Sequence, residues 1–279
     1  MIYSAKWEFN NVCNLKCPYC CVPQTPRKEL PHGEKLKIID NIAEMGITDI
    51  DFFGKEPLFN DEIFRLIDHA ESHETFNNYT FITNGVNLDR YKSEILKSPV
   101  KNFTVSFDGG VFRKNPDWNL LSWFTDNDMS VEISIDVHQY NYEDIYKHYR
   151  AFEDCGIMLV YIKPIINSAG YEISDGDYVK FIKIILDSGV TLLKRTVIDV
   201  PYFFPMTRGF TKDKIYNSID FDYDLNCDAG KTQIFIACDG KVYGCGRACH
   251  TGSIWHTTFD RVDTLKNIKG RHCQQKEGG

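Results

Sequence analysis

Residues 7–20 read WEFNNVCNLKCPYC, in which WEFNNV has the pattern of a strand and the remaining eight residues carry three cysteines. The C-x3-C-x2-C spacing of Cys13, Cys17 and Cys20 allows three thiolates to close on one soft metal centre. A closed structural zinc site and an ordinary electron-transfer cluster each need four ligands, so one coordination position is left open. The alternatives are half of a zinc site or three thiols that do not act together.

Composition limits the class of protein. The 279 residues suffice for one large α/β domain, or for a core with a small appendage. The net charge is −7 and no basic cluster stands out, so nucleic acid is not expected as a main partner. Apolar runs of membrane-spanning length and a signal peptide are both missing from the sequence. We therefore expect no membrane partner and a cytoplasmic location.

The distribution of the ten cysteines indicates metal binding at both ends of the chain. Four lie within residues 13–21 and five within residues 227–273, and Cys155 stands alone between the two groups. Reducing compartments do not favour structural disulfides, so metal coordination is the economical reason for so many thiols. Cys155 is expected to pack on the face of a helix.

Helical and strand patterns alternate from residue 34 to about residue 165. With the first strand, this alternation makes six β/α units, which predicts parallel strands joined by helical crossovers. The expected fold class is α/β, a partial (β/α)6 barrel. The predicted helices cover residues 34–46, 60–73, 86–98, 117–128 and 141–156, and the predicted strands cover residues 48–54, 79–83, 101–107, 130–137 and 157–165.

Polar motifs follow successive predicted strands, where barrel enzymes carry their chemistry. Each motif taken singly is also consistent with a turn or a helix cap. Their order after successive strands is much harder to obtain by chance. The motifs are Gly54-Lys55-Glu56-Pro57, Thr83-Asn84-Gly85, Ser106-Phe107-Asp108-Gly109 and Asp136-Val137-His138.

The cysteine spacing, with aromatic Tyr19 before the third cysteine, resembles the signature of the radical S-adenosylmethionine (radical SAM) superfamily. The resemblance spans roughly residues 7–165. It implies a [4Fe-4S] cluster held by the three cysteines, with the open iron chelating the amino and carboxylate groups of S-adenosylmethionine.

The same resemblance implies roles for the motifs after the strands. Residues 54–57 are similar to the Gly-Gly-Glu-Pro motif that holds the methionyl amino group, although Lys55 replaces the second glycine and puts close backbone approach there in question. Side chains near the next strand ends contact the carboxylate and ribose in that family. The residues implied to bind the cofactor are Gly54, Lys55, Glu56, Pro57, Thr83, Asn84, Ser106, Asp108 and Asp136.

The C-terminal region is expected to contain a hairpin, with strands at residues 231–237 and 241–244 around the turn pair Asp239-Gly240. The spacing Cys227-x12-Gly240-x4-Cys245 resembles the opening of the SPASM or twitch extension, which implies one or two further [4Fe-4S] clusters. Because this region has fewer cysteines than the two-cluster form requires, one auxiliary cluster is expected. Cys238 is not expected as a ligand, because a position beside the turn should lie more than ~10 Å from Cys245.

The expected ligands of the auxiliary cluster are Cys227, Cys245, Cys249 and Cys273. Cys249 has a rival role as a thiol that donates a hydrogen atom to a substrate radical. A third alternative is a structural zinc ribbon built from the same four cysteines. The expected domains are a barrel core at residues 1–170, a connector helix and loop at 171–226, and the auxiliary-cluster domain at 227–279.

The resemblance implies an enzyme that cleaves S-adenosylmethionine reductively to a 5′-deoxyadenosyl radical and removes hydrogen from a C–H bond of a peptide or small-molecule substrate. Cross-linking, oxidation or epimerisation would follow, with electrons from a flavodoxin- or ferredoxin-type reductant. The alternatives are an aminoglycoside or cyclitol epimerase or dehydrogenase and, from another class, a non-enzymatic iron-sulfur electron carrier. The sequence begins at the first strand, so a leader-peptide-binding domain is expected, if at all, on a separate protein.

Overall fold

The computed structural model describes residues 2–20, 22, 27–165, 170–187, 196–198, 220–221, 232–244 and 257–258. Within these residues one sheet has the strand order β11-β10-β9-β1-β2-β3-β4-β5-β6-β7-β8 and is open between its two edges. The strands are β1 (Ser4–Glu8), β2 (Asp49–Phe53), β3 (Asn78–Thr83), β4 (Asn102–Phe107), β5 (Ser130–Val137), β6 (Leu159–Pro164), β7 (Thr196–Ile198), β8 (Asp220–Phe221), β9 (Gln233–Ile236), β10 (Lys241–Tyr243) and β11 (Thr257–Thr258).

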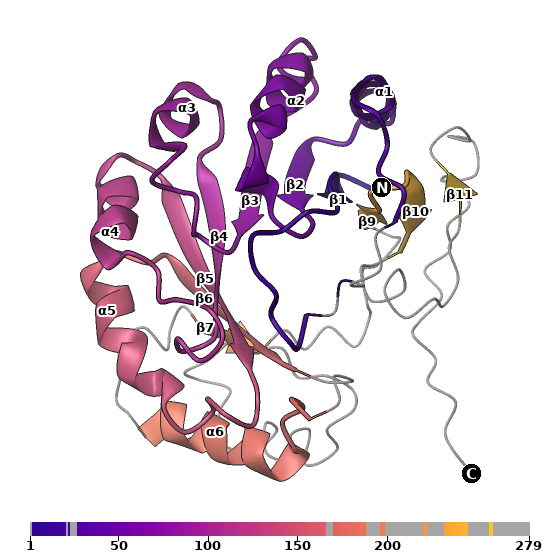
Figure 1. Ribbon diagram of the computed structural model, residues 1–279. Helices are drawn as coiled ribbons and strands as arrows, with labels where there is room; N and C mark the ends of the chain where they lie inside the picture. The colour runs from indigo at the N-terminus through magenta and orange to yellow at the C-terminus, as the bar shows by residue number, and fades with distance from the viewer. Residues whose placement is uncertain are drawn as a thin grey trace, which may run out of the picture.

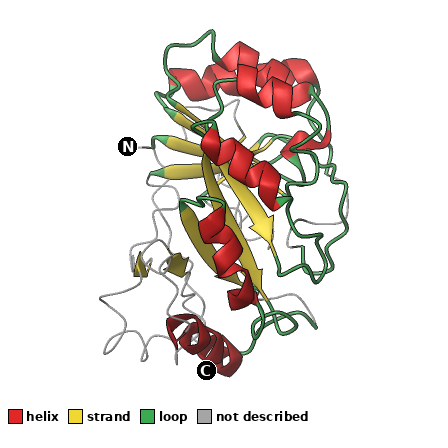
Figure 2. Ribbon diagram, turned by 90° about the vertical axis from the view of Figure 1, so that its left-hand side faces the viewer, coloured by secondary structure: helices red, strands yellow, loops and turns green. Residues whose placement is uncertain are grey.

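Six helices follow the first six strands in turn, which confirms the predicted partial (β/α)6 barrel. The helices line the outer side of the sheet in Figure 1, and Figure 2 shows them lying over one face of it. They are α1 (His32–Glu44), α2 (Glu62–Ala70), α3 (Lys92–Lys97), α4 (Trp118–Asp126), α5 (Tyr149–Asp154) and α6 (Asp175–Asp187), with short 3-10 turns η1 (Pro57–Phe59) and η2 (Ile145–His148).

Parallel pairing runs from β1 through to β8, so the carboxyl ends of these strands meet at one edge. The C-terminal hairpin is confirmed, since β9 and β10 pair antiparallel with Val242 opposite Ile236. Strand β9 also pairs in parallel with β1, with Ser4 opposite Gln233, so the hairpin extends the barrel sheet. The domain division at residues 171 and 227 stays a prediction.

The two faces of the sheet differ in polarity because side chains alternate along each strand. In β4, Phe103, Val105 and Phe107 are buried in the core, and the residues between them are polar and half-buried. Helix α2 buries Ile63, Leu66, Ile67 and Ala70, which recur at helical spacing on one side. The apolar core therefore lies between the sheet and its helices, and the opposite face offers polar side chains.

Three predicted elements are shorter than their sequence patterns indicated. The first strand ends at Glu8 and not at residue 12, because Asn10 turns its amide to the Glu56 carbonyl at 2.9 Å. The helix predicted at 86–98 begins at Lys92, after turns at residues 86–91 in which the Asn87 side chain donates to the Leu58 carbonyl at 2.7 Å. The helix predicted at 141–156 becomes η2 and α5, because the Asn141 side chain bonds two backbone carbonyls instead. Among the described helices, none combines the length and apolarity that a membrane crossing requires.

Candidate cofactor site

The loop after β1 brings the three predicted cysteines together. Cys13 and Cys20 are half-buried and Cys17 is buried, and all three thiols are close enough to influence one another electrostatically. A turn between Cys20 N and the Cys17 carbonyl, 3.1 Å apart, holds the last two ligands. The Cys13 sulfur accepts hydrogen bonds from Leu15 N at 3.3 Å and from Asn84 Nδ2 at 3.7 Å. The cysteine loop is thus tied to the end of β3.

The spacing of the three thiols fits a cluster better than a single zinc ion. Tetrahedral zinc with bonds of about 2.3 Å brings its sulfur ligands within about 3.8 Å of one another. In the described part of the chain, the one group of three candidate ligand atoms that all lie within 4.8 Å of one another consists of Asp40, His69 and His73. The three cysteine sulfurs do not form such a group, so they do not all lie within 4.8 Å of one another. Burial raises the pKa of the Cys13 and Cys20 thiols, so metal binding must release their protons.

Two cations face the cysteine loop. Arg113 and Lys55 both lower the pKa of Cys20 against the larger, opposing effect of its burial. Cys17 also lies close enough to Arg113 to contribute to the raised pKa of Arg113. A positive surround of this kind stabilises thiolates and the negative charge of a thiolate-bound cluster. The donor set and the charge of the loop therefore suit the group that the sequence predicts.

Glu56 is a fully buried carboxylate of the site. Its Oε1 accepts hydrogen bonds from Leu58 N at 2.9 Å and Thr83 Oγ1 at 2.7 Å, and its Oε2 accepts one from Asn84 N at 2.8 Å. Burial raises the pKa of Glu56 and these donors oppose the rise. Since a carboxylate oxygen accepts two hydrogen bonds, Oε2 retains capacity for a cationic donor.

The backbone before Glu56 explains why a glycine is needed at position 54 but not at position 55, where the Gly-Gly-Glu-Pro motif has its second glycine. Gly54 has a φ of +140°, and an added Cβ would lie 3.2 Å from the Asn10 carbonyl oxygen and 3.3 Å from Glu8 Cγ. Among the described residues other than glycine, only Asp128 has a positive φ, so Lys55 sits in an ordinary conformation. The close approach is therefore made at Gly54, and a side chain is accommodated at position 55.

Gly54→Ala is accordingly expected to lower the free energy of unfolding by about 1–3 kcal/mol, because it adds both steric contact and backbone strain. Gly33→Ala is the matched control, since Gly33 lies in α1 with nothing within 4 Å of the added Cβ. That variant should stay within about 1 kcal/mol of wild type or gain stability. Urea unfolding of both variants measures the difference. Equal unfolding midpoints would contradict the claim that a side chain at position 54 is strained.

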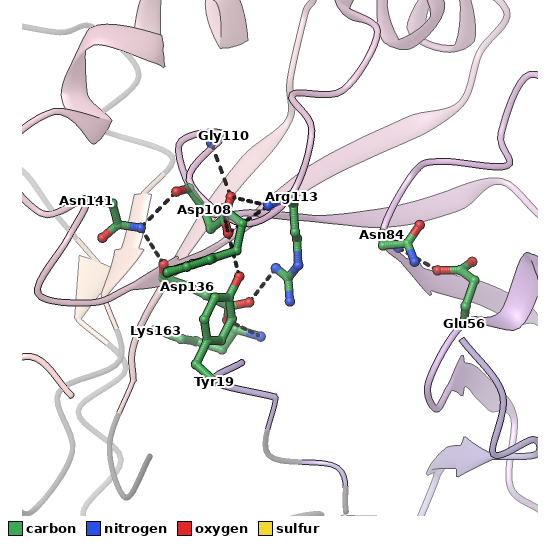
Figure 3. Close-up of polar contacts among 10 residues, drawn as sticks. Tyr19, Glu56, Asn84, Asp108, Gly110, Arg113, Asp136, Asn141 and Lys163 are labelled. Carbon is green, nitrogen blue, oxygen red and sulfur yellow. Dashed lines mark hydrogen bonds and ion pairs between the residues drawn. The ribbon is translucent and has the colours of Figure 1, made fainter. Parts of the chain in front are cut away.

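A second polar group lies at the ends of β4 and β5 (Figure 3). Tyr19, one residue before the third cysteine, donates its hydroxyl hydrogen bond to Asp108 Oδ2 at 2.8 Å. Asp108 is fully buried and also accepts from the backbone N–H groups of Gly110, Phe112 and Arg113. Asp108 thus positions the loop after β4 against the cysteine loop. Its direct contact with the cofactor stays a prediction.

Arg113 spans the gap between this loop and β5. Its Nη1 lies 2.6 Å from Asp136 Oδ2, and its guanidinium lies over the Tyr19 ring, 5.3 Å from the centroid. Burial alone would lower the pKa of Arg113, but Asp136, Tyr19 and Cys17 together outweigh it and the pKa is raised. Lys163 approaches Asp136 Oδ1 from β6 at 3.9 Å. Asp136 therefore anchors the two cations, and Arg113 Nε has no partner among the described residues.

Aromatic rings close one side of this group. The centroid of Tyr19 lies 5.7 Å from that of Phe112, 5.2 Å from that of His138 and 6.5 Å from that of Tyr171. His138 is fully buried, and burial lowers its pKa, so the imidazole is neutral near pH 7. These rings pack around Tyr19, directly before the third cysteine.

Arg113 was not identified from the sequence, and no local signal marks it. It stands in an ordinary polar loop, RKNPD, and becomes notable only through Asp136, which lies 23 residues later.

Ser106, which was identified from the sequence, is half-buried on β4 opposite Ser134 of β5. Cys155 is buried and donates to the Trp118 carbonyl at 3.2 Å. Burial chiefly raises the pKa of the Cys238 thiol to about 12, and the expectation that Cys238 is not a ligand of the auxiliary cluster stays a prediction. The predicted ligands Cys227, Cys245, Cys249 and Cys273 fall outside the described residues.

Comparison with known proteins gives a family match and several relatives. Residues 7–160 match the radical SAM superfamily. A PqqA peptide cyclase of Granulibacter bethesdensis is 34% identical over 104 residues, which cover 36% of this chain and 27% of that protein. A GTP 3′,8-cyclase of Desulforamulus reducens is 30% identical over 111 residues, 38% of this chain and 33% of that protein. The chain therefore spans about a quarter to a third of the length of these curated relatives.

Among solved structures, Streptococcus suis SuiB bound to the precursor peptide SuiA superposes with a TM-score of 0.73 at 16% identity, covering 95% of this chain and 64% of that chain. SuiB bound to S-adenosylmethionine superposes with a TM-score of 0.70 at 16% identity, covering 94% and 65%. At this identity the likeness concerns the fold.

Proposed function

Because this chain belongs to the radical SAM superfamily, we propose that it cleaves S-adenosylmethionine reductively and removes a hydrogen atom from a C–H bond of a peptide. The observation that carries the proposal is the set of three thiols beside buried Glu56 and Arg113 at the carboxyl edge of the sheet. When bound, the cluster and S-adenosylmethionine supply a 5′-deoxyadenosyl radical, and the protein supplies position and exclusion of water.

Each charged group of the cofactor has a matching side chain in the site. Glu56 is suited to the methionyl ammonium group, because Oε2 keeps acceptor capacity and a cation offsets the burial of the carboxylate. Arg113 is suited to the methionyl carboxylate, because Asp136 fixes its guanidinium while Nε keeps a donor. Thr83 and Asn84 position Glu56, and Tyr19 positions Arg113 through stacking.

A peptide is proposed as the substrate because the match to a PqqA peptide cyclase and the likeness to SuiB bound to a precursor peptide both point to that class. The second candidate is a small molecule, which the match to a GTP 3′,8-cyclase supports. An aminoglycoside or cyclitol would belong to this second class. Nucleotide and peptide libraries, assayed for substrate-dependent loss of S-adenosylmethionine, separate the two.

One auxiliary [4Fe-4S] cluster on Cys227, Cys245, Cys249 and Cys273 is part of the proposal, with the rival role of Cys249 as a hydrogen donor retained. The spacing of Cys227, Gly240 and Cys245 supports it. An auxiliary cluster would take an electron from the substrate radical and lead to oxidation or cross-linking, whereas a thiol would lead to inversion. The first electron is proposed to come from a reductant of the flavodoxin or ferredoxin class.

The test of the proposed function is 5′-deoxyadenosine formation by the anaerobically reconstituted and reduced protein. Formation of 5′-deoxyadenosine and methionine in equal amounts is the expected result. A protein that holds its cluster and is reduced, yet leaves S-adenosylmethionine intact, would instead be an electron carrier.

Glu56→Gln is expected to raise the Kd for S-adenosylmethionine about 10- to 100-fold, because a hydrogen bond to a charged group contributes about 1.5–3 kcal/mol. Iron content should not change, since Glu56 is not a cluster ligand. Glu34→Gln removes the same charge from an exposed position of α1 and should leave the affinity unchanged. Equilibrium binding of labelled S-adenosylmethionine to the three reconstituted proteins decides the point, and wild-type affinity in Glu56→Gln would remove Glu56 from the cofactor site.

A further inference from the structure

Two histidines and an aspartate meet between α1 and α2, which lie side by side in Figure 1. Nε2 of His69 lies 2.7 Å from Asp40 Oδ1, and Nε2 of His73 lies 3.0 Å from the same oxygen. We propose that Asp40, His69 and His73 bind a divalent transition-metal ion of the zinc class. No step of the proposed radical chemistry depends on this site.

The local structure places both imidazoles on one side. His69 lies in the last turn of α2, and the chain continues in a helical path, with Ser72 N bonded to the His69 carbonyl and His73 N to the Ala70 carbonyl. Residues four apart in a helical path face the same way, so both rings point to Asp40 of α1. The His73 ring also packs edge-on against Phe76, at 6.0 Å between centroids, which limits its orientation.

The distances suit a metal ion. The three ligand atoms all lie within 4.8 Å of one another. A tetrahedral zinc ion with bonds of about 2.0–2.1 Å separates its ligand atoms by about 3.3 Å, close to the two separations found here. The side chains need only a small outward movement to admit the ion.

The chemistry of the three groups also suits a metal ion. Both imidazoles direct Nε2 at the same oxygen, Asp40 Oδ1. A single metal cation can take the place of the protons in these two hydrogen bonds. The side chains are 31% (His69), 41% (Asp40) and 27% (His73) exposed, so an ion can enter and a water molecule can complete its shell.

The site is separate from the cysteine loop. In a parallel β/α unit each helix runs back against its strand, so the C-terminal end of α2 lies at the edge where β3 begins. The bonds from Asn77 N and Asn78 N to the Thr48 carbonyl confirm that this segment lies beside the start of β2. The cysteine loop follows the opposite end of β1. A bound ion would link α1 to α2 and stabilise the native state without touching the cofactor.

The test is zinc counting by equilibrium dialysis of tag-free, cluster-loaded protein under anaerobic conditions. His69→Gln/His73→Gln is expected to bind about one zinc ion fewer per chain than wild type, with iron content unchanged. His32→Gln is the matched control: His32 also pairs with a carboxylate between α1 and α2, Glu62 Oε1 at 3.1 Å, but among the described residues it belongs to no cluster of three candidate ligands. It should bind as much zinc as wild type.

Thermal unfolding gives a second readout. Zinc at about 100 times its Kd should raise the Tm of wild type by roughly 5–10 °C and leave the double variant unshifted. The metal-free double variant should unfold like metal-free wild type within a few degrees, which shows that it folds. Equal zinc counts in wild type and double variant, or a loss of zinc in His32→Gln as large as in the double variant, would overturn the proposal. Formation of 5′-deoxyadenosine is measured separately and reports only on the proposed function.

Discussion

Replacing Cys13, Cys17 and Cys20 together by alanine is expected to remove about four iron atoms per chain and to reduce 5′-deoxyadenosine formation to background. The three thiols of the cysteine loop supply all the protein ligands of the proposed cluster, and without it no electron reaches S-adenosylmethionine. Iron and acid-labile sulfide counting after anaerobic reconstitution, followed by the 5′-deoxyadenosine assay, measures both effects.

Cys155→Ser is the matched control for this variant. The Cys155 thiol is buried and donates to the Trp118 carbonyl at 3.2 Å, a bond that a hydroxyl can keep, so iron content should equal that of wild type. A triple variant that retains the full iron complement would contradict the assignment of the cluster to these cysteines. About four irons remaining in the triple variant would support the auxiliary cluster, whereas none would leave the C-terminal cysteines as a zinc ribbon or as free thiols.

Lys35→Met is expected to lower the free energy of unfolding by about 3–5 kcal/mol, the usual effect of removing one partner from a buried ion pair. Lys35 lies inside the molecule, with 2% of its side chain exposed, and its Nζ is 2.6 Å from Glu29 Oε1 and 2.7 Å from Glu62 Oε2. Loss of the cation leaves these carboxylates close together without their counter-ion. Urea unfolding of the reconstituted protein measures the effect.

The same change should loosen the cysteine loop. Glu29 Oε2 accepts a hydrogen bond from Asn11 N at 3.1 Å, two residues before Cys13. When Lys35 no longer holds Glu29, iron should be lost to a chelator faster than from wild type. Lys37→Met is the control in the same helix, because Lys37 is 68% exposed and its partner within the described part of the chain is exposed Glu34. Its effect should stay within about 0.5 kcal/mol. Equal effects of the two lysine variants would contradict a special role for Lys35.

The fold class was predictable from local patterns. Segments with the period of 2 typical of strands alternate with segments of the helical period of 3.6. The spacing of Ile63, Leu66 and Ile67 in α2 is an example of the helical period. The alternation implies parallel strands with helical crossovers. The element ends were predicted less well, because polar residues at those ends bond to distant groups. Asn10, for example, ends β1 by bonding the carbonyl of Glu56, which lies 46 residues away.

The residues of the candidate site also fall into those that the sequence could identify and those that it could not. Cys13, Cys17 and Cys20 could be recognised because metal ligation here depends on a spacing within eight residues. Arg113 could not, because its importance arises from contacts with Asp136 and with the ring of Tyr19.

By itself, the sequence determined an α/β barrel pattern and a three-cysteine loop that leaves a metal position open, since both depend on short-range periodicity and spacing. Tertiary structure alone decided which side chains meet at the carboxyl edge and which meet between α1 and α2. The contact of Tyr19 with Asp108 joins residues 89 positions apart, and that of Asp40 with His69 joins residues 29 apart. Such contacts depend on strand order, register and helix packing, which no local pattern encodes.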